Sequence, residues 1–150
     1  MGIRQQASIV PSTAGTPALF AADEKWILAA NTVYYFPLPQ AIAGAGGLLA
    51  CQLTCYDATA VITAYIEDSL HATAPLTTDS IEWVKEDPPS SYVGVVGVGW
   101  ASTAASVSSV GTGAGSAIWH MELGSVFARL RVSVGAAGGA VRVASSSKGP

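Results

Sequence analysis

Apolar and polar side chains alternate along much of this chain, the pattern of β-strands that bury one face. The segment 48–56 is the clearest case, because Cys51, Leu53 and Cys55 fall on one face and polar residues on the other. Similar runs, rich in β-branched and aromatic residues, cover 26–28, 32–37, 60–67, 81–85, 92–100, 117–122, 127–134 and 140–144. No convincing amphipathic helix is found, and the one candidate, 18–30, fits the start of a strand at Trp26 and Ile27 equally well. Short strands spaced by turns predict an all-β fold, an antiparallel β-sandwich of jelly-roll type.

Segments of small and polar residues separate these runs. The Gly- and Ala-rich segment 43–47, the polar segment 68–80 and the Ser- and Gly-rich segment 102–116 read as loops. Gly135–Gly139 reads as a hairpin turn that pairs the last two runs. One register of this hairpin places Arg131 opposite Arg142.

Residues 1–24 read as an extended N-terminal arm, and residues 25–150 as a single β-sandwich domain. Proline and glycine interrupt the arm, which has no hydrophobic period. A disordered tail would have this composition too, but such tails are poor in large apolar residues. The arm therefore favours docking on a neighbouring protein through its large apolar residues Ile9, Val10, Leu19 and Phe20.

Charge is unusually scarce in this sequence. Charged residues make up 11% of the chain and hydrophobic residues 50%, with a net charge of −3. Soluble domains carry roughly a quarter charged residues, so much of this surface is expected to pack on other proteins. The basic residues form no run, which argues against a nucleic-acid partner. Glycine, serine and proline punctuate the long uncharged stretches, which argues against a membrane span, and no targeting segment is evident.

Residues able to do chemistry are few and scattered. Cys51 and Cys55 could bind a metal with His71 and His120, but their spacing fits two free thiols on a core face, as expected for a chain made in a reducing cytoplasm. The acidic residues of the middle third read as solvated loop charges. The segment 111–115 lacks the lysine of a phosphate-binding loop, and the chain has no Gly-x-Ser-x-Gly nucleophile elbow. We expect no catalytic residue, no cofactor, no metal and no enzymatic activity.

Outward-facing arginines are the most informative local feature. Arg129, Arg131 and Arg142 alternate with apolar residues in the last two runs. Like charges directly opposite each other destabilise a sheet, so an acidic surface of a partner or a neighbouring copy would neutralise them. A solvated face with splayed arginines stays open as the alternative. The tryptophans and tyrosines leave a sugar-binding face open as well, although aromatic residues in strands also build cores.

Three blocks of the sequence resemble small virion proteins encoded near the capsid gene of tailed bacteriophages. They are Trp26–Pro39; the acidic stretch leading to Trp83–Pro88 with Tyr92–Val93; and Ala117–Gly124 with Arg129–Val132 and Gly139–Val143. They are patterns of strands and turns that span most of the chain after residue 25.

The resemblance implies a head decoration, or cement, protein on the capsid exterior of the virion. Its partners would be the major capsid protein and neighbouring copies in a homo-oligomer or on the shell, held by the arm, one sheet face and the arginines. A tail or collar component, or a carbohydrate-binding adhesion module, is the alternative. A hydrolase is disfavoured because no nucleophile, base and orienting acid can be assigned.

Overall fold

The computed structural model describes residues 4–8, 11–13, 17–21, 25–38, 48–57, 59–69, 81–85, 91–96, 100–103, 106–109, 114–122 and 127–148. Their regular elements are all β-strands: β1 (Arg4–Ser8), β2 (Leu19–Ala21), β3 (Lys25–Leu28), β4 (Val33–Pro37), β5 (Leu48–Cys55), β6 (Ile62–Ser69), β7 (Val84–Lys85), β8 (Ser91–Val96), β9 (Trp100–Thr103), β10 (Ser106–Ser109), β11 (Gly115–Glu122), β12 (Phe127–Val134) and β13 (Gly139–Lys148). Within these ranges, no helix capable of crossing a membrane occurs.

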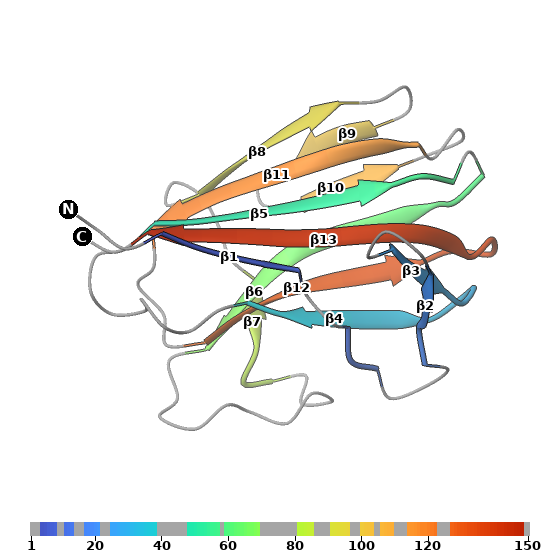
Figure 1. The fold of residues 1–150 in the computed structure, drawn as a ribbon, viewed down its shortest axis with the longest axis horizontal. Helices are drawn as coiled ribbons and strands as arrows, with labels where there is room; N and C mark the ends of the chain where they lie inside the picture. Colours follow the sequence, from blue (N-terminus) through green and yellow to red (C-terminus); the bar gives the residue numbers. More distant parts are fainter. Residues whose placement is uncertain are drawn as a thin grey trace.

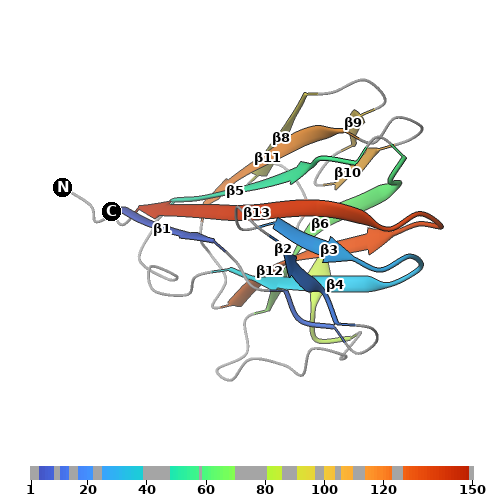
Figure 2. The same cartoon turned by 45° about the vertical axis from the view of Figure 1, so that its right-hand side comes forward.

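The strands form two antiparallel sheets (Figures 1 and 2). The first, sheet A, has the order β2-β3-β13-β5-β11-β8, and β1 also pairs with β13. The second, sheet B, has the order β4-β12-β6-β10-β9, and β7 also pairs with β6. The all-β class and the antiparallel pairing predicted from the alternation are confirmed.

One hydrophobic core is shared by the two sheets. Each long strand turns alternate residues inward, as a period of two requires. The largest fully buried side chains come from both sheets: Trp119, Tyr34, Phe36, Leu28, Leu53, Ile62, Ile66, Leu130, Val132 and Val141. The hydroxyl of Tyr34 accepts a hydrogen bond of 2.9 Å from the Ala29 backbone N–H, which satisfies its polar end in the core. The predicted inward face of 48–56 is confirmed, because Cys51, Leu53 and Cys55 are all buried.

The predicted C-terminal hairpin is wrong. β12 lies between β4 and β6 in sheet B, whereas β13 pairs with β3, β5 and β1 in sheet A. The register of Arg131 opposite Arg142 is wrong for the same reason, since Arg131 pairs with Tyr35 and Tyr65 and Arg142 pairs with Thr54. Alternation tells which side chains face inward but not which sheet receives the strand, so a turn within one sheet and a crossing between two sheets look alike in sequence.

The crossing from β12 to β13 brings three chain segments close together. The Gly135 N–H donates to the Val61 carbonyl at 2.8 Å, and the Gly135 carbonyl accepts from the Asn31 N–H at 2.8 Å. A Cβ added at Gly138 would lie 2.5 Å from the Leu28 carbonyl oxygen. Glycine at position 138 therefore permits the backbone contact that carries the chain from one sheet to the other.

Two other sequence predictions need correction. The predicted loop 102–116 contains the end of β9, all of β10 and the start of β11. The predicted single strand 92–100 is divided between β8 in sheet A and β9 in sheet B. The segment 18–30 contains the strands β2 and β3, in agreement with the predicted all-β class and the strand predicted at 26–28. Serine- and threonine-rich strands escape a search for apolar alternation because their identity as strands comes from backbone pairing with neighbours.

The N-terminal segment contacts both sheets. β1 pairs with Ala144–Lys148 of β13, and β2 pairs with β3. Between them, Ser12 forms an isolated bridge to Tyr35, with backbone hydrogen bonds of 2.7 and 2.8 Å. The Thr13 hydroxyl donates to the Val33 carbonyl at 3.0 Å. Docking of an arm on another protein stays a prediction, and its residues Ile9 and Val10 lie outside the described residues.

Candidate interaction surfaces

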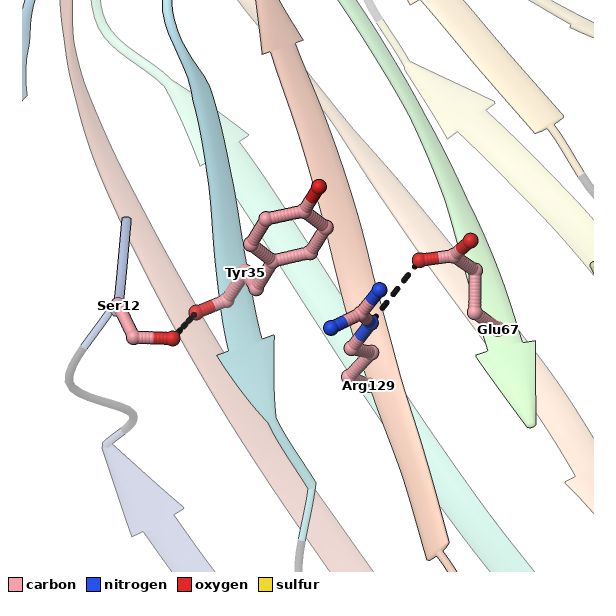
Figure 3. Close-up of polar contacts among 4 residues, drawn as sticks. All are labelled: Ser12, Tyr35, Glu67 and Arg129. Carbon is pink, nitrogen blue, oxygen red and sulfur yellow. Dashed lines mark hydrogen bonds and ion pairs between the residues drawn. The ribbon is translucent and has the colours of Figure 1, made fainter. Parts of the chain in front are cut away.

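Arg129 lies on the outer face of sheet B, but it is covered. Its Nε donates to Glu67 Oε1 at 2.9 Å, and the two residues face each other across β12 and β6 (Figure 3). The guanidinium carbon lies 3.9 Å from the centroid of the Tyr35 ring and 4.2 Å from that of Trp83. Only 3% of Arg129 is exposed. An approaching partner therefore meets the side chains that cover Arg129 rather than its charge.

The electrostatics of this cluster are those of a compensated buried ion pair. Burial lowers the pKa of Arg129, while the nearby Glu67 carboxylate acts in the opposite direction. A guanidinium remains protonated under such conditions, so the pair stays ionic. Glu67 thus supplies within the chain the compensating charge that the sequence analysis assigned to a partner. Glu67 is 9% exposed in β6, so its interpretation as a solvated loop charge is wrong.

The other two arginines lie on different sheets. Arg131 is half-buried on sheet B, with its guanidinium carbon 5.3 Å from the centroid of the Tyr65 ring. Arg142 is exposed on β13 of sheet A, opposite Thr54. The three arginines therefore form no continuous stripe, because the strands that carry them separate into two sheets. A role of each arginine in binding a partner stays a prediction.

The end of sheet A at β2 exposes large apolar side chains. Leu19 is 68% exposed and Phe20 is 62% exposed, and both lie on the last strand of the sheet order. The Phe20 ring packs edge-on against Trp26, with centroids 5.0 Å apart. Leu19 pairs with Ile27, which is 40% exposed. Sequence reasoning singled out Leu19 and Phe20, and the structure places them on opposite sides of the strand that ends the described part of sheet A, the usual place for adding another strand.

The two cysteines are buried free thiols on the inward face of β5. Burial raises the pKa of Cys51 to about 12 and also raises the pKa of Cys55. Cys51 pairs with Trp119, which faces inward from β11. His120 follows Trp119 in the same strand, so the His120 side chain points to the opposite face of the sheet from Cys51. Among the described residues no group of three metal-ligating side chains is present, and His71 lies outside them.

Sequence reasoning missed two features. The first is Trp83, which stacks on Arg129 from a segment 46 residues away in the chain. The second is the pair of exposed apolar side chains on either side of it, Ile81 at 85% and Val84 at 62% exposure. The only signal in the sequence is the presence of large apolar residues beside several acids, which also fits an ordinary strand. Their exposure becomes visible only when β7 is placed on the edge of β6.

Comparison with protein-family models, curated proteins and solved structures finds no match to this chain. The all-β architecture alone does not decide the function, since one fold serves many functions.

Proposed function

We propose that this chain is a structural virion protein that binds the outer surface of a tailed-phage capsid and stabilises the shell. The observation that carries the proposal is the exposed apolar edge strand β2, with Leu19 and Phe20 more than half exposed, in a chain of only 11% charged residues. Exposed large apolar side chains at the end of a sheet are suited to contact with another protein.

The strand order supports a jelly-roll sandwich. Four strands of sheet A follow the order β3-β13-β5-β11, and four strands of sheet B follow the order β4-β12-β6-β10. Consecutive strands from β3 to β6 alternate between the sheets, and so do β11, β12 and β13. This is the order expected of eight strands in two four-stranded jelly-roll sheets, an architecture used in viral capsid and lectin domains.

Adhesion by strand addition is the mechanism that we propose. A strand of the major capsid protein would pair with the open edge of β2, and the Phe20 ring would pack against the apolar side chains of that strand. Backbone hydrogen bonds supply affinity in such contacts, and pockets for alternate side chains supply specificity. The remaining arm residues, with Ile9 and Val10, would extend the contact. Such a role uses no cofactor and no turnover.

Co-sedimentation with capsid shells assembled without this protein tests the proposal. We expect the full chain to saturate the shells at a fixed ratio to the major capsid protein. Phe20→Ser should weaken binding by roughly tenfold, because it removes a hydrophobic anchor that binding would bury. Val61→Ser is the matched control, since Val61 is 40% exposed but lies on the connection between β5 and β6.

The Phe20→Ser substitution locates the contact with the shell more specifically than a truncation of the N-terminal segment does. Deletion of residues 1–20 should also weaken shell binding, but it removes β1, the Ser12 bridge and most of β2 as well. If the full chain does not sediment with shells, the capsid proposal fails. If Phe20→Ser and Val61→Ser bind equally well, the β2 edge is not the contact. Binding to tails, or quenching of tryptophan fluorescence by glycans, would instead support the tail or carbohydrate-binding alternative.

A further inference from the structure

We infer that residues 11–13 form a cap on the free edge of β4, and that a chain without this cap pairs with a second copy of itself through β4. The cap belongs to the N-terminal segment, for which the sequence analysis predicted docking on another protein. Its second role is autoinhibitory, because it closes the end of sheet B to other strands. This inference goes beyond capsid binding and does not depend on it.

β4 ends the strand order of sheet B in the described part of the chain, so only one of its two sides pairs with another strand of the sheet. The Leu38 N–H donates to the Ala128 carbonyl at 2.9 Å, which shows that the backbone groups of even-numbered residues face β12. Backbone groups alternate in direction along an antiparallel strand. The backbone N–H and C=O groups of Val33 and Tyr35, and the C=O of Pro37, therefore face the free side of β4.

The cap bonds the centre of this free edge. The Ser12 N–H donates to the Tyr35 carbonyl at 2.7 Å, and the Ser12 carbonyl accepts from the Tyr35 N–H at 2.8 Å. The Thr13 hydroxyl donates to the Val33 carbonyl at 3.0 Å. Figure 3 shows Ser12 on the side of β4 away from Arg129 of β12, and the Ser12 hydroxyl also donates to the Tyr35 carbonyl at 3.3 Å. The cap thus occupies the backbone groups that an added strand would use at the middle of β4.

Two prolines limit strand pairing at this end of the sheet. Pro11 precedes Ser12 in the cap and has no N–H, so it offers no hydrogen-bond donor to a further strand. Pro37 likewise has no N–H to donate at the last position of β4. Prolines and covering segments are devices by which proteins protect sheet edges that would otherwise pair with another chain. Their combination at β4 indicates that the cap covers an edge able to accept another strand.

The free edge of β4 is complementary to the same edge of a second copy. Antiparallel pairing about a two-fold axis at Tyr35 joins the Tyr35 N–H of each copy to the Tyr35 carbonyl of the other. The same axis brings the Val33 N–H of one copy to the Pro37 carbonyl of the other. The two Tyr35 side chains then lie opposite each other on the outer face, and such cross-strand aromatic pairs stabilise a sheet. Each donor on this edge therefore has an acceptor in the second copy.

Pairing of identical edges is isologous, so it closes on itself and stops at a dimer. The cap and the second copy compete for the same Tyr35 N–H and C=O groups, because both bond them from the free side of β4. The intact chain satisfies these groups with Ser12 of its own N-terminal segment. Weakening of the cap is therefore expected to shift the chain toward a dimer joined through β4.

Sedimentation velocity of the full chain, without any shells, tests the inference. The uncapped variant, Ser12→Pro/Thr13→Val, lacks the Ser12 N–H and the Thr13 hydroxyl that bond β4. We expect it to dimerise at a concentration roughly tenfold lower than the wild type, or lower still. Thr32→Val is the matched control and should behave like the wild type, because the Thr32 hydroxyl bonds the Ala30 carbonyl at 3.0 Å rather than the free edge of β4.

Val33→Pro, added to the uncapped variant, tests the β4 contact itself. It removes the Val33 N–H that the two-fold pairing uses in each copy, while proline is tolerated at the first residue of an edge strand. Dimerisation should then return to the wild-type level. An uncapped variant that dimerises no more readily than the wild type overturns the inference, and so does a dimer that Val33→Pro leaves intact or association that grows beyond a dimer. Phe20→Ser should weaken shell binding but leave this dimer unchanged, so failure of this inference and failure of the capsid proposal are distinguishable.

Discussion

The ion pair between Arg129 and Glu67 allows a stability prediction from geometry. Arg129→Met keeps an unbranched apolar stem but leaves the Glu67 carboxylate, 11% exposed in its side chain, without its counter-charge. Removing one partner of a buried ion pair costs about 3–5 kcal/mol. Loss of the cation–π contacts with Tyr35 and Trp83 adds to this cost. Because the pair lies on an outer sheet face, from which Glu67 can turn toward water, we expect a value near the lower end, about 3 kcal/mol.

Urea unfolding followed by circular dichroism measures this effect. With a slope of about 2 kcal/mol per molar urea, a loss of about 3 kcal/mol lowers the midpoint by roughly 1.5 M. The double variant Arg129→Met/Glu67→Met removes both charges, so its midpoint should return close to that of the wild type. Glu67→Gln distinguishes the contribution of the Glu67 charge to stability from the contribution of its size, because glutamine keeps the size and an acceptor oxygen but carries no charge.

Two results would refute this reasoning. A midpoint for Arg129→Met within about 0.5 M of the wild type would mean that the pair behaves like an exposed salt bridge, worth less than about 1 kcal/mol. A double variant as unstable as the single variant would mean that lost packing, rather than an unpaired carboxylate, causes the loss.

Three further predictions follow from burial and close packing. Burial raises the pKa of Cys51 from 9.0 to about 12, so between pH 9 and 12 the thiol ionises only in the unfolded chain. The free energy of unfolding should therefore be highest below pH 9 and decline between pH 9 and 12. Unfolding at several alkaline pH values measures this decline, which should be less steep for Cys51→Ala. Gly138→Ala places a Cβ 2.5 Å from the Leu28 carbonyl oxygen and should cost about 1–3 kcal/mol, seen as a lower Tm, whereas an unchanged Tm would show that the turn can shift. Trp83→Ala removes one of the two rings stacked on Arg129 and should cost roughly 1 kcal/mol in urea unfolding, and no loss would show that this ring contributes nothing.

Conclusions drawn from the sequence hold best where the signal is local. The alternation in 48–56 and 127–134 identified the inward faces, and residues such as Leu53, Leu130 and Val132 are buried as that alternation requires. Leu19 and Phe20 are exposed on β2, and their predicted docking on another protein stays a prediction. These conclusions needed only the spacing and polarity of neighbouring residues, because the direction of a side chain in a strand follows from a period of two.

The sequence could not assign strands to sheets. The connections after β3, β5 and β12 all carry the chain between sheet A and sheet B. Such a connection contains the same kinds of small and polar residues as a hairpin turn within one sheet, so the sequence does not distinguish the two. The strands β9 and β10 went unrecognised because serine and threonine supply little apolar alternation, while pairing of β10 with β6 makes them part of the sheet.

Spacing and polarity along the chain were enough to predict the all-β class, the inward faces of the main strands and the scarcity of charge. Which strands are neighbours, and therefore which side chains meet, followed from the three-dimensional arrangement of the two sheets. Arg129 and Glu67 are 62 residues apart in the chain and become partners because β12 lies beside β6. Leu19, Lys25 and Arg142 share a face because β2, β3 and β13 are in register. The physical reason is that alternation is a property of one strand, whereas pairing depends on competition among all the strands for one core.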